Sequence, residues 1–165
     1  MTNLDEIKDT LWLYATHQQH PTQVDEAHAA LKGFGDLVLD GLIWALHQEA
    51  VDLKLLVFQL LQEHYTDAER ALPAVRALIS DDEDRLFRVT AINTLHVLGD
   101  TSSDLMSLLT PRLESDDAFE RLCSAANLWR ISRSEDAFVV LRREAARLGS
   151  PMAEMAKGYL DEAEA

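Results

Sequence analysis

The chain has 165 residues, with 15 Lys or Arg against 29 Asp or Glu, so its formal net charge is −14. Hydrophobic residues make up 47% of the sequence, a globular composition that argues against a disordered chain. This length fits one domain, residues 1–165. The strong negative charge disfavours nucleic acid and anionic membranes as partners, and it favours a basic protein.

The single cysteine, Cys123, excludes an intrachain disulfide and a cysteine-only metal site. A reducing compartment is therefore expected. Residues 1–10 carry three acids and lack a basic segment followed by an apolar stretch, so they do not resemble a signal peptide. No apolar run is long enough to span a bilayer. We therefore expect a soluble, cytoplasmic protein.

Apolar residues recur at helical spacing along the chain, which predicts an all-α fold. Acids and hydroxyl residues suited to helix N-termini stand before residues 85, 105 and 118. Glycines suited to helix C-termini stand at positions 35 and 99. Pro111 falls late in a predicted helix and should kink or stop it. The expected elements are five antiparallel helix pairs, over residues 4–34, 36–65, 67–98, 103–131 and 135–161.

Residues 71–79, an acidic turn and residues 86–100 together resemble one HEAT repeat, the helix pair of an armadillo-type family. The family's turn aspartate corresponds to Asp84, its second-helix arginine to Arg88, and its small residue to Ala91. The pattern recurs 33 positions later at Asp117, Arg121, Ser124, Leu128 and Ile131. The resemblance, clearest over residues 71–133, implies a short right-handed α-solenoid. The alternatives are armadillo-like pairing of the helices and an irregular helical bundle. In the second unit Ser132-Arg133 replaces the family's Gly-Asp.

The resemblance also implies an internal ladder of charges. Lys54, Arg88 and Arg121 occupy repeat-related positions, and stacking should bring the arginines near the turn carboxylates Asp84 and Asp117. A partly buried charge without its partner costs several kcal/mol. Architecture alone therefore explains these residues.

Aligning the second helices on the two arginines predicts a set of outward-facing apolar residues. Second helices line the concave surface of a repeat stack, so these residues are expected to form a binding groove. The alternative is that the short array curls enough to bury them. Trp129, followed by Arg130, is the aromatic anchor candidate. The expected groove residues are Leu55, Leu86, Val89, Phe119, Leu122, Trp129 and Arg130. The expected polar rim is Asp52, Asn93, Glu120 and Arg130, with an acidic rim of Asp82, Glu83 and Asp116.

The sequence offers no motif for catalysis. The histidines are spread over different predicted helices, and no His-Glu dipeptide occurs of the kind that HEAT-like iron hydroxylases use. Cys123 precedes a small inward position and is expected to be a packed residue. Motifs for a serine nucleophile or a phosphate-binding loop are also lacking. We therefore expect no enzyme, no metal site and no cofactor.

These observations favour a non-catalytic protein-binding module. Its most concrete form is a small acidic cytoplasmic inhibitor, such as an immunity protein that covers a basic toxin. One alternative is a HEAT-repeat adaptor or scaffold in a larger complex. A second alternative, from a different class, is a HEAT-type enzyme or cofactor lyase.

Overall fold

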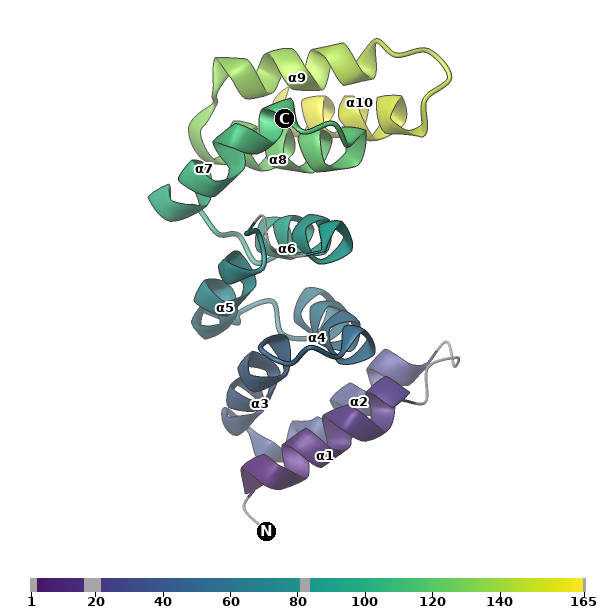
Figure 1. Ribbon diagram of the computed structural model, residues 1–165, viewed down its shortest axis with the longest axis vertical. Helices are drawn as coiled ribbons and strands as arrows, with labels where there is room; N and C mark the ends of the chain where they lie inside the picture. Colours follow the sequence, from purple (N-terminus) through teal and green to yellow (C-terminus); the bar gives the residue numbers. More distant parts are fainter. Residues whose placement is uncertain (1–2, 17–21, 81–83, 165) are drawn as a thin grey trace. The chain divides into compact units, whose positions relative to one another are not determined.

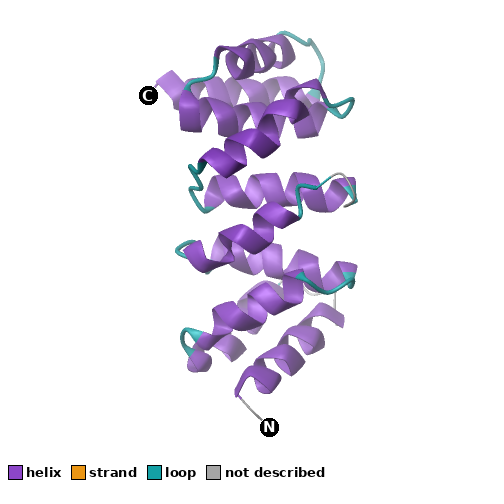
Figure 2. Ribbon diagram, turned by 60° about the vertical axis from the view of Figure 1, so that its left-hand side comes forward, coloured by secondary structure: helices purple, strands orange, loops and turns teal. Residues whose placement is uncertain are grey.

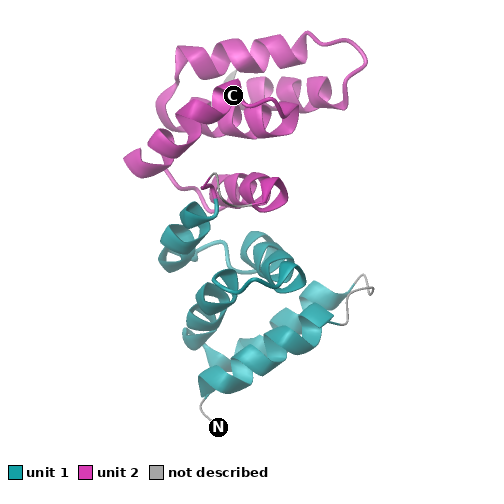
Figure 3. Ribbon diagram, in the orientation of Figure 1, with its two compact units in different colours: residues 1–78 teal, residues 79–165 magenta. Residues whose placement is uncertain are grey.

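A computed structural model describes residues 3–16, 22–80 and 84–164 (Figure 1). Over these residues all regular structure is helical, which confirms the predicted all-α class (Figure 2). None of the helices in this part of the chain has the length and apolar character needed to cross a membrane. The contacts within the chain fall into two compact units, Met1–Leu78 and Ile79–Ala165 (Figure 3).

The first unit is built around α1, which packs against α2, α3 and α4. Gly41 of α3 lies directly on α1, where an added Cβ atom would overlap Ile7 Cγ2. The absence of a side chain at position 41 thus permits this close approach of the two helices. The elements of the unit are α1 (Asn3–Thr16), α2 (Gln23–Leu31), η1 (Lys32–Phe34), α3 (Leu37–Leu46), α4 (Val51–Glu63), η2 (Glu69–Ala71) and α5 (Leu72–Ala77).

The second unit is built around α8, which packs against α6, α7, η3, α9 and α10. Neighbours on so many sides bury every residue from 120 to 128, including charged ones. The elements of this unit are α6 (Arg85–Val97), α7 (Ser103–Leu109), η3 (Thr110–Glu114), α8 (Ala118–Ser132), α9 (Glu135–Ala145) and α10 (Pro151–Glu164). The two helices of the expected third pair, α5 and α6, fall in different units.

Local signals predicted the helix ends well. The side chains of Asp84, Ser102 and Asp117 accept hydrogen bonds from backbone N–H groups in the first turns of α6, α7 and α8. Gly35 and Gly99 have φ of 56° and 69°, a left-handed conformation that glycine adopts without a steric penalty. The predicted effect of Pro111 is also confirmed, because α7 ends at Leu109 and the 3-10 helix η3 follows.

The charge ladder differs from its prediction. Arg88 Nε donates a hydrogen bond to Glu120 Oε1 at 3.0 Å, and Arg121 Nε and Nη2 donate to Glu144 Oε1 at 3.3 and 3.2 Å. The carboxylates against the two arginines therefore belong to helices, whereas Asp84 and Asp117 cap helix N-termini. Glu120, expected on the rim of the groove, is only 2% exposed because it faces this pairing inside the second unit.

Candidate protein-binding groove and histidine pocket

A hollow of about 480 Å³ lies over the first turns of α6 and α8 in the second unit. It brings together three of the predicted groove residues, Leu86, Val89 and Phe119, because the two helices pack against each other. We call this hollow the α6/α8 groove. Its complete lining is Asp84, Arg85, Leu86, Val89, Thr90, Asp117 and Phe119.

The apolar residues of the α6/α8 groove differ in their exposure. Leu86 is 51% exposed, Phe119 is half-buried, and Val89 is buried at 7% exposure. Val89 therefore forms part of the packed floor and is not a freely exposed anchor as predicted, since α6 turns this position toward the interior of the unit. Leu86 is therefore the exposed apolar side chain of the groove.

Carboxylates and one guanidinium group surround the apolar surface of the groove. Asp84 and Asp117 are both helix caps, and Asp117 Oδ2 also lies 3.2 Å from Arg85 Nη1. Asp116, predicted for the acidic rim, is exposed beside this group. The other two predicted rim residues, Asp82 and Glu83, lie outside the described residues.

Two further groove predictions are not met. Leu122 is 0% exposed and belongs to the core, because α8 is covered on several sides by other helices of the unit. Its predicted outward orientation is therefore wrong. Leu55 is half-buried on α4, in the first unit, and it does not line the α6/α8 groove.

Trp129 and Arg130 lie toward the C-terminal end of α8 and not in the groove. The Trp129 ring stacks on Phe138 with centroids 4.8 Å apart, which ties α8 to α9. Arg130 Nη2 donates a 2.7 Å hydrogen bond to the backbone oxygen of Asp100. Both residues line a separate pocket of about 130 Å³ together with His96 and other side chains. Their described contacts are thus structural ones within the second unit.

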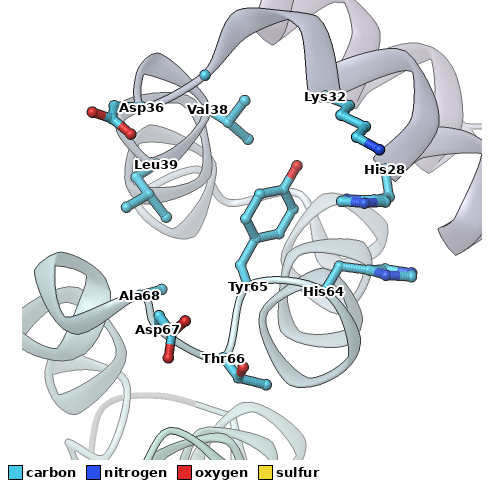
Figure 4. A pocket seen from close by; sticks show the side chains of 11 residues that line it. His28, Lys32, Asp36, Val38, Leu39, His64, Tyr65, Thr66, Asp67 and Ala68 are labelled. Carbon is cyan, nitrogen blue, oxygen red and sulfur yellow. The ribbon is translucent and has the colours of Figure 1, made fainter.

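The first unit contains a pocket that the sequence did not indicate (Figure 4). It has a volume of about 400 Å³, and His28 from α2 and His64 from the end of α4 lie at its edge. Their rings stack in parallel with centroids 4.2 Å apart, and Tyr65 meets His28 edge-on at 5.2 Å. Figure 4 shows the Tyr65 hydroxyl directed toward the space between Val38 and Lys32.

Some polar groups of this pocket lack hydrogen-bond partners. Within the described part of the chain, His28 Nδ1 and the Tyr65 hydroxyl are buried and have no hydrogen-bond partner. Burial lowers the pKa of His28, and the nearby His64 and Lys32 lower it further. Burial raises the pKa of Tyr65. At neutral pH the pocket therefore presents a neutral imidazole and a protonated phenol.

Packing of α2 on α4 brings these histidines together, and no spacing rule connects positions 28 and 64 in the sequence. His17 and His20, the only closely spaced histidine pair, lie outside the described residues. Cys123 is 2% exposed, which confirms it as a packed residue, and burial and Asp117 raise its pKa to about 12. A thiol with this pKa is a poor nucleophile.

Comparison with protein-family models, with curated proteins and with solved structures finds no match to this chain. Indications of function therefore come from the α6/α8 groove, the histidine pocket and the net charge of −14. The groove is the feature that combines an exposed apolar side chain with acidic surroundings. The pocket combines paired rings with unsatisfied polar atoms.

Proposed function

We propose that this chain is a non-catalytic protein-binding module that uses the α6/α8 groove to hold a basic protein. The observation that carries the proposal is the exposed Leu86 beside the half-buried Phe119, in a groove that also contains Asp84 and Asp117. Desolvation of an apolar anchor stabilises a formed interface. The surrounding negative charge speeds the approach of a basic surface.

The most specific form of this proposal is a small cytoplasmic inhibitor, such as an immunity protein, that covers the basic active site of a toxin. The formal charge of −14 supports that form. A single buried cysteine suits a reducing compartment. We further propose that the helix pairs stack as a HEAT-like α-solenoid, on the basis of the repeat over residues 71–133.

The test is kinetic and uses a basic protein recovered with the tagged chain. Leu86→Ala should weaken the complex mainly through faster dissociation, because the anchor acts after the interface has formed. Val139→Ala is the matched control, since Val139 is a 62% exposed apolar residue on α9 outside the groove. Parent-like dissociation of the Leu86 variant, or an equal effect of the control, would show that the groove is not the interface.

The electrostatic part of the proposal has its own measurement. Asp116→Asn should slow association and reduce its dependence on ionic strength, while dissociation changes little. Both rate constants are to be measured at low and high salt. Salt-independent association of the parent protein would contradict steering by the acidic surface.

A further inference from the structure

At the edge of the histidine pocket, two helices of the first unit bring three metal-ligating side chains together. Asp25 lies in the first turn of α2, Glu63 is the last residue of α4, and His64 follows it. One ligand atom from each residue lies within 4.8 Å of the other two. The packing of α2 on α4, and not proximity in sequence, places Asp25 against the other two residues.

The contact between His64 and Asp25 leaves one polar atom, His64 Nε2, without a hydrogen-bond partner among the described residues. His64 Nε2 lies 3.0 Å from Asp25 Oδ1. The nitrogen is nevertheless buried and has no hydrogen-bond partner among the described residues, so the approach does not have hydrogen-bond direction. Tetrahedral Zn²⁺, with ligands at about 2.0–2.1 Å, holds neighbouring ligand atoms about 3.3 Å apart. The observed separation is close to this value.

We propose that Asp25, Glu63 and His64 form a binding site for a divalent first-row transition metal ion, with Zn²⁺ as the probe. Two carboxylates balance the charge of the ion, and the imidazole completes a mixed nitrogen and oxygen donor set. The imidazole favours such an ion over Mg²⁺ or Ca²⁺, which take oxygen ligands. The proposal does not depend on the α6/α8 groove.

The exposure of the three ligand side chains shows which of them can adjust to a metal ion and which is held in place. The Asp25 side chain is 72% exposed and Glu63 is also exposed, so both can adjust to an ion without rearranging the core. The His64 side chain is 20% exposed, and its ring stacks on His28. His28 lies on α2, one helical turn after Asp25. His28 therefore acts as a positioning residue for the imidazole. Three protein ligands leave a coordination position for water or another small donor.

The experiment titrates the full chain with ZnCl₂ near neutral pH by isothermal titration calorimetry. We expect one high-affinity Zn²⁺ per chain, and Asp25→Asn, Glu63→Gln and His64→Ala should each weaken its binding about tenfold or more. His47→Ala is the matched control and should bind like the parent. His47 is exposed at the end of α3, with Nδ1 2.7 Å from the Ile43 backbone oxygen, and it is not part of the cluster.

Two features keep the test decisive. Asp25→Asn and Glu63→Gln change exposed side chains, so they report on binding even if His64→Ala fails to fold. In the parent protein, Zn²⁺ should shift the imidazole nitrogen resonances of His64. Excess Mg²⁺ should not displace the bound Zn²⁺. The proposal is overturned if no binding occurs up to about 1 mM Zn²⁺, or if either carboxylate variant keeps the parent affinity. Overturning it would leave the proposed groove function intact, because the groove lies in the other unit.

Discussion

The guanidinium group of Arg88 on α6 and the carboxylate of Glu120 on α8 meet at 3.0 Å, where their side chains are only 16% and 2% exposed. The second oxygen of Glu120 accepts a 2.7 Å hydrogen bond from Ser115 Oγ. Arg112 Nη1 approaches the first oxygen at 3.8 Å. One buried carboxylate thus joins α6, η3 and the start of α8.

Arg88→Ala should lower the free energy of unfolding by about 1–3 kcal/mol, because it leaves the buried Glu120 with fewer partners and removes the packed arginine stem. Arg121→Ala should have an effect of similar size through Glu144. Denaturant titration measures both. The exposed control Glu162→Ala should stay within about 0.5 kcal/mol. Equal, negligible changes in all three variants would contradict a structural role for the ion pairs.

Two leucines of the second unit allow the same chemical change to be made in opposite environments. Leu122→Ala should cost about 2–5 kcal/mol, because it opens a cavity at a fully buried position. Leu86→Ala should change stability by about 0.5 kcal/mol or less, since Leu86 is 51% exposed. Thermal or denaturant unfolding distinguishes the two. Similar losses would mean that Leu86 belongs to the core and is not available to a partner.

Two helical glycines provide a second matched pair. Gly41→Ala should destabilise the first unit by about 1–3 kcal/mol, because the new methyl group would overlap Ile7 on α1. Gly158→Ala on α10 meets no atom within 4 Å and should stabilise its helix by up to about 1 kcal/mol. The sign of the change in unfolding free energy is the measurement. A gain at both positions would contradict the close approach of α1 and α3.

Features that depend only on residues a few positions away in the sequence were predictable. The capping roles of Asp84 and Asp117 and the helix stop before Pro111 follow from backbone chemistry within a few residues. The partners of the buried arginines were not predictable, because Glu120 and Glu144 have the same local sequence character as exposed helix acids. Packing on several sides of α8 decides which helix face is buried.

The same distinction applies to the two candidate sites: part of one was predictable from the sequence, whereas the other depends on packing. Alignment of the second helices of two successive predicted repeats placed Leu86 and Phe119 together, because their relation follows from the repeat spacing. His28 and His64 do not occupy repeat-related positions, and their stacking depends on how α2 packs against α4, so neither periodicity nor a motif indicates it. Leu122 was misplaced because the alignment gives repeat-related positions but does not determine which of them other helices cover.

Cys123 should be inert in the folded protein. Burial raises its pKa to about 12, so the thiolate fraction at pH 8 is very small, and the side chain is 2% exposed. A thiol reagent should label the native chain far more slowly than the urea-unfolded chain. Comparable labelling rates would contradict the packed position of Cys123 in α8.

His96 should make stability fall on acidification. Burial and Arg130 lower its pKa below the ordinary value of 6.5, against a smaller opposing effect of Glu162. The unfolded chain therefore binds the proton first as the pH falls. The contribution of the neutral ring is complete above about pH 6.5 and is lost as the pH falls through that value toward the folded-state pKa.

The measurement is the loss of unfolding free energy between about pH 7.5 and about pH 5.5. His96→Gln should show a smaller loss than the parent, because glutamine does not titrate. An imidazole titration followed by nuclear magnetic resonance gives the same sign directly. A folded-state pKa at or above 6.5, or equal pH dependence of parent and variant, would contradict the expected effect of burial.

The ion pair between Arg121 and Glu144 has a consequence for how α8 and α9 align. Glu144 is 0% exposed, and the Arg121 guanidinium group reaches it from the neighbouring helix at 3.2 Å. Sliding α9 by one helical turn, about 5.4 Å, would still bring apolar surfaces together but would separate these charges. Arg143 and Arg147, at 3.7 and 3.3 Å from Glu144, would move with it, but both are half-exposed, and loss of the one buried partner, Arg121, is costly. The pair therefore selects one register of α9 against α8 among packings that hydrophobic contact alone would leave close in energy. This selection reduces the number of compact misfolded states available to the chain.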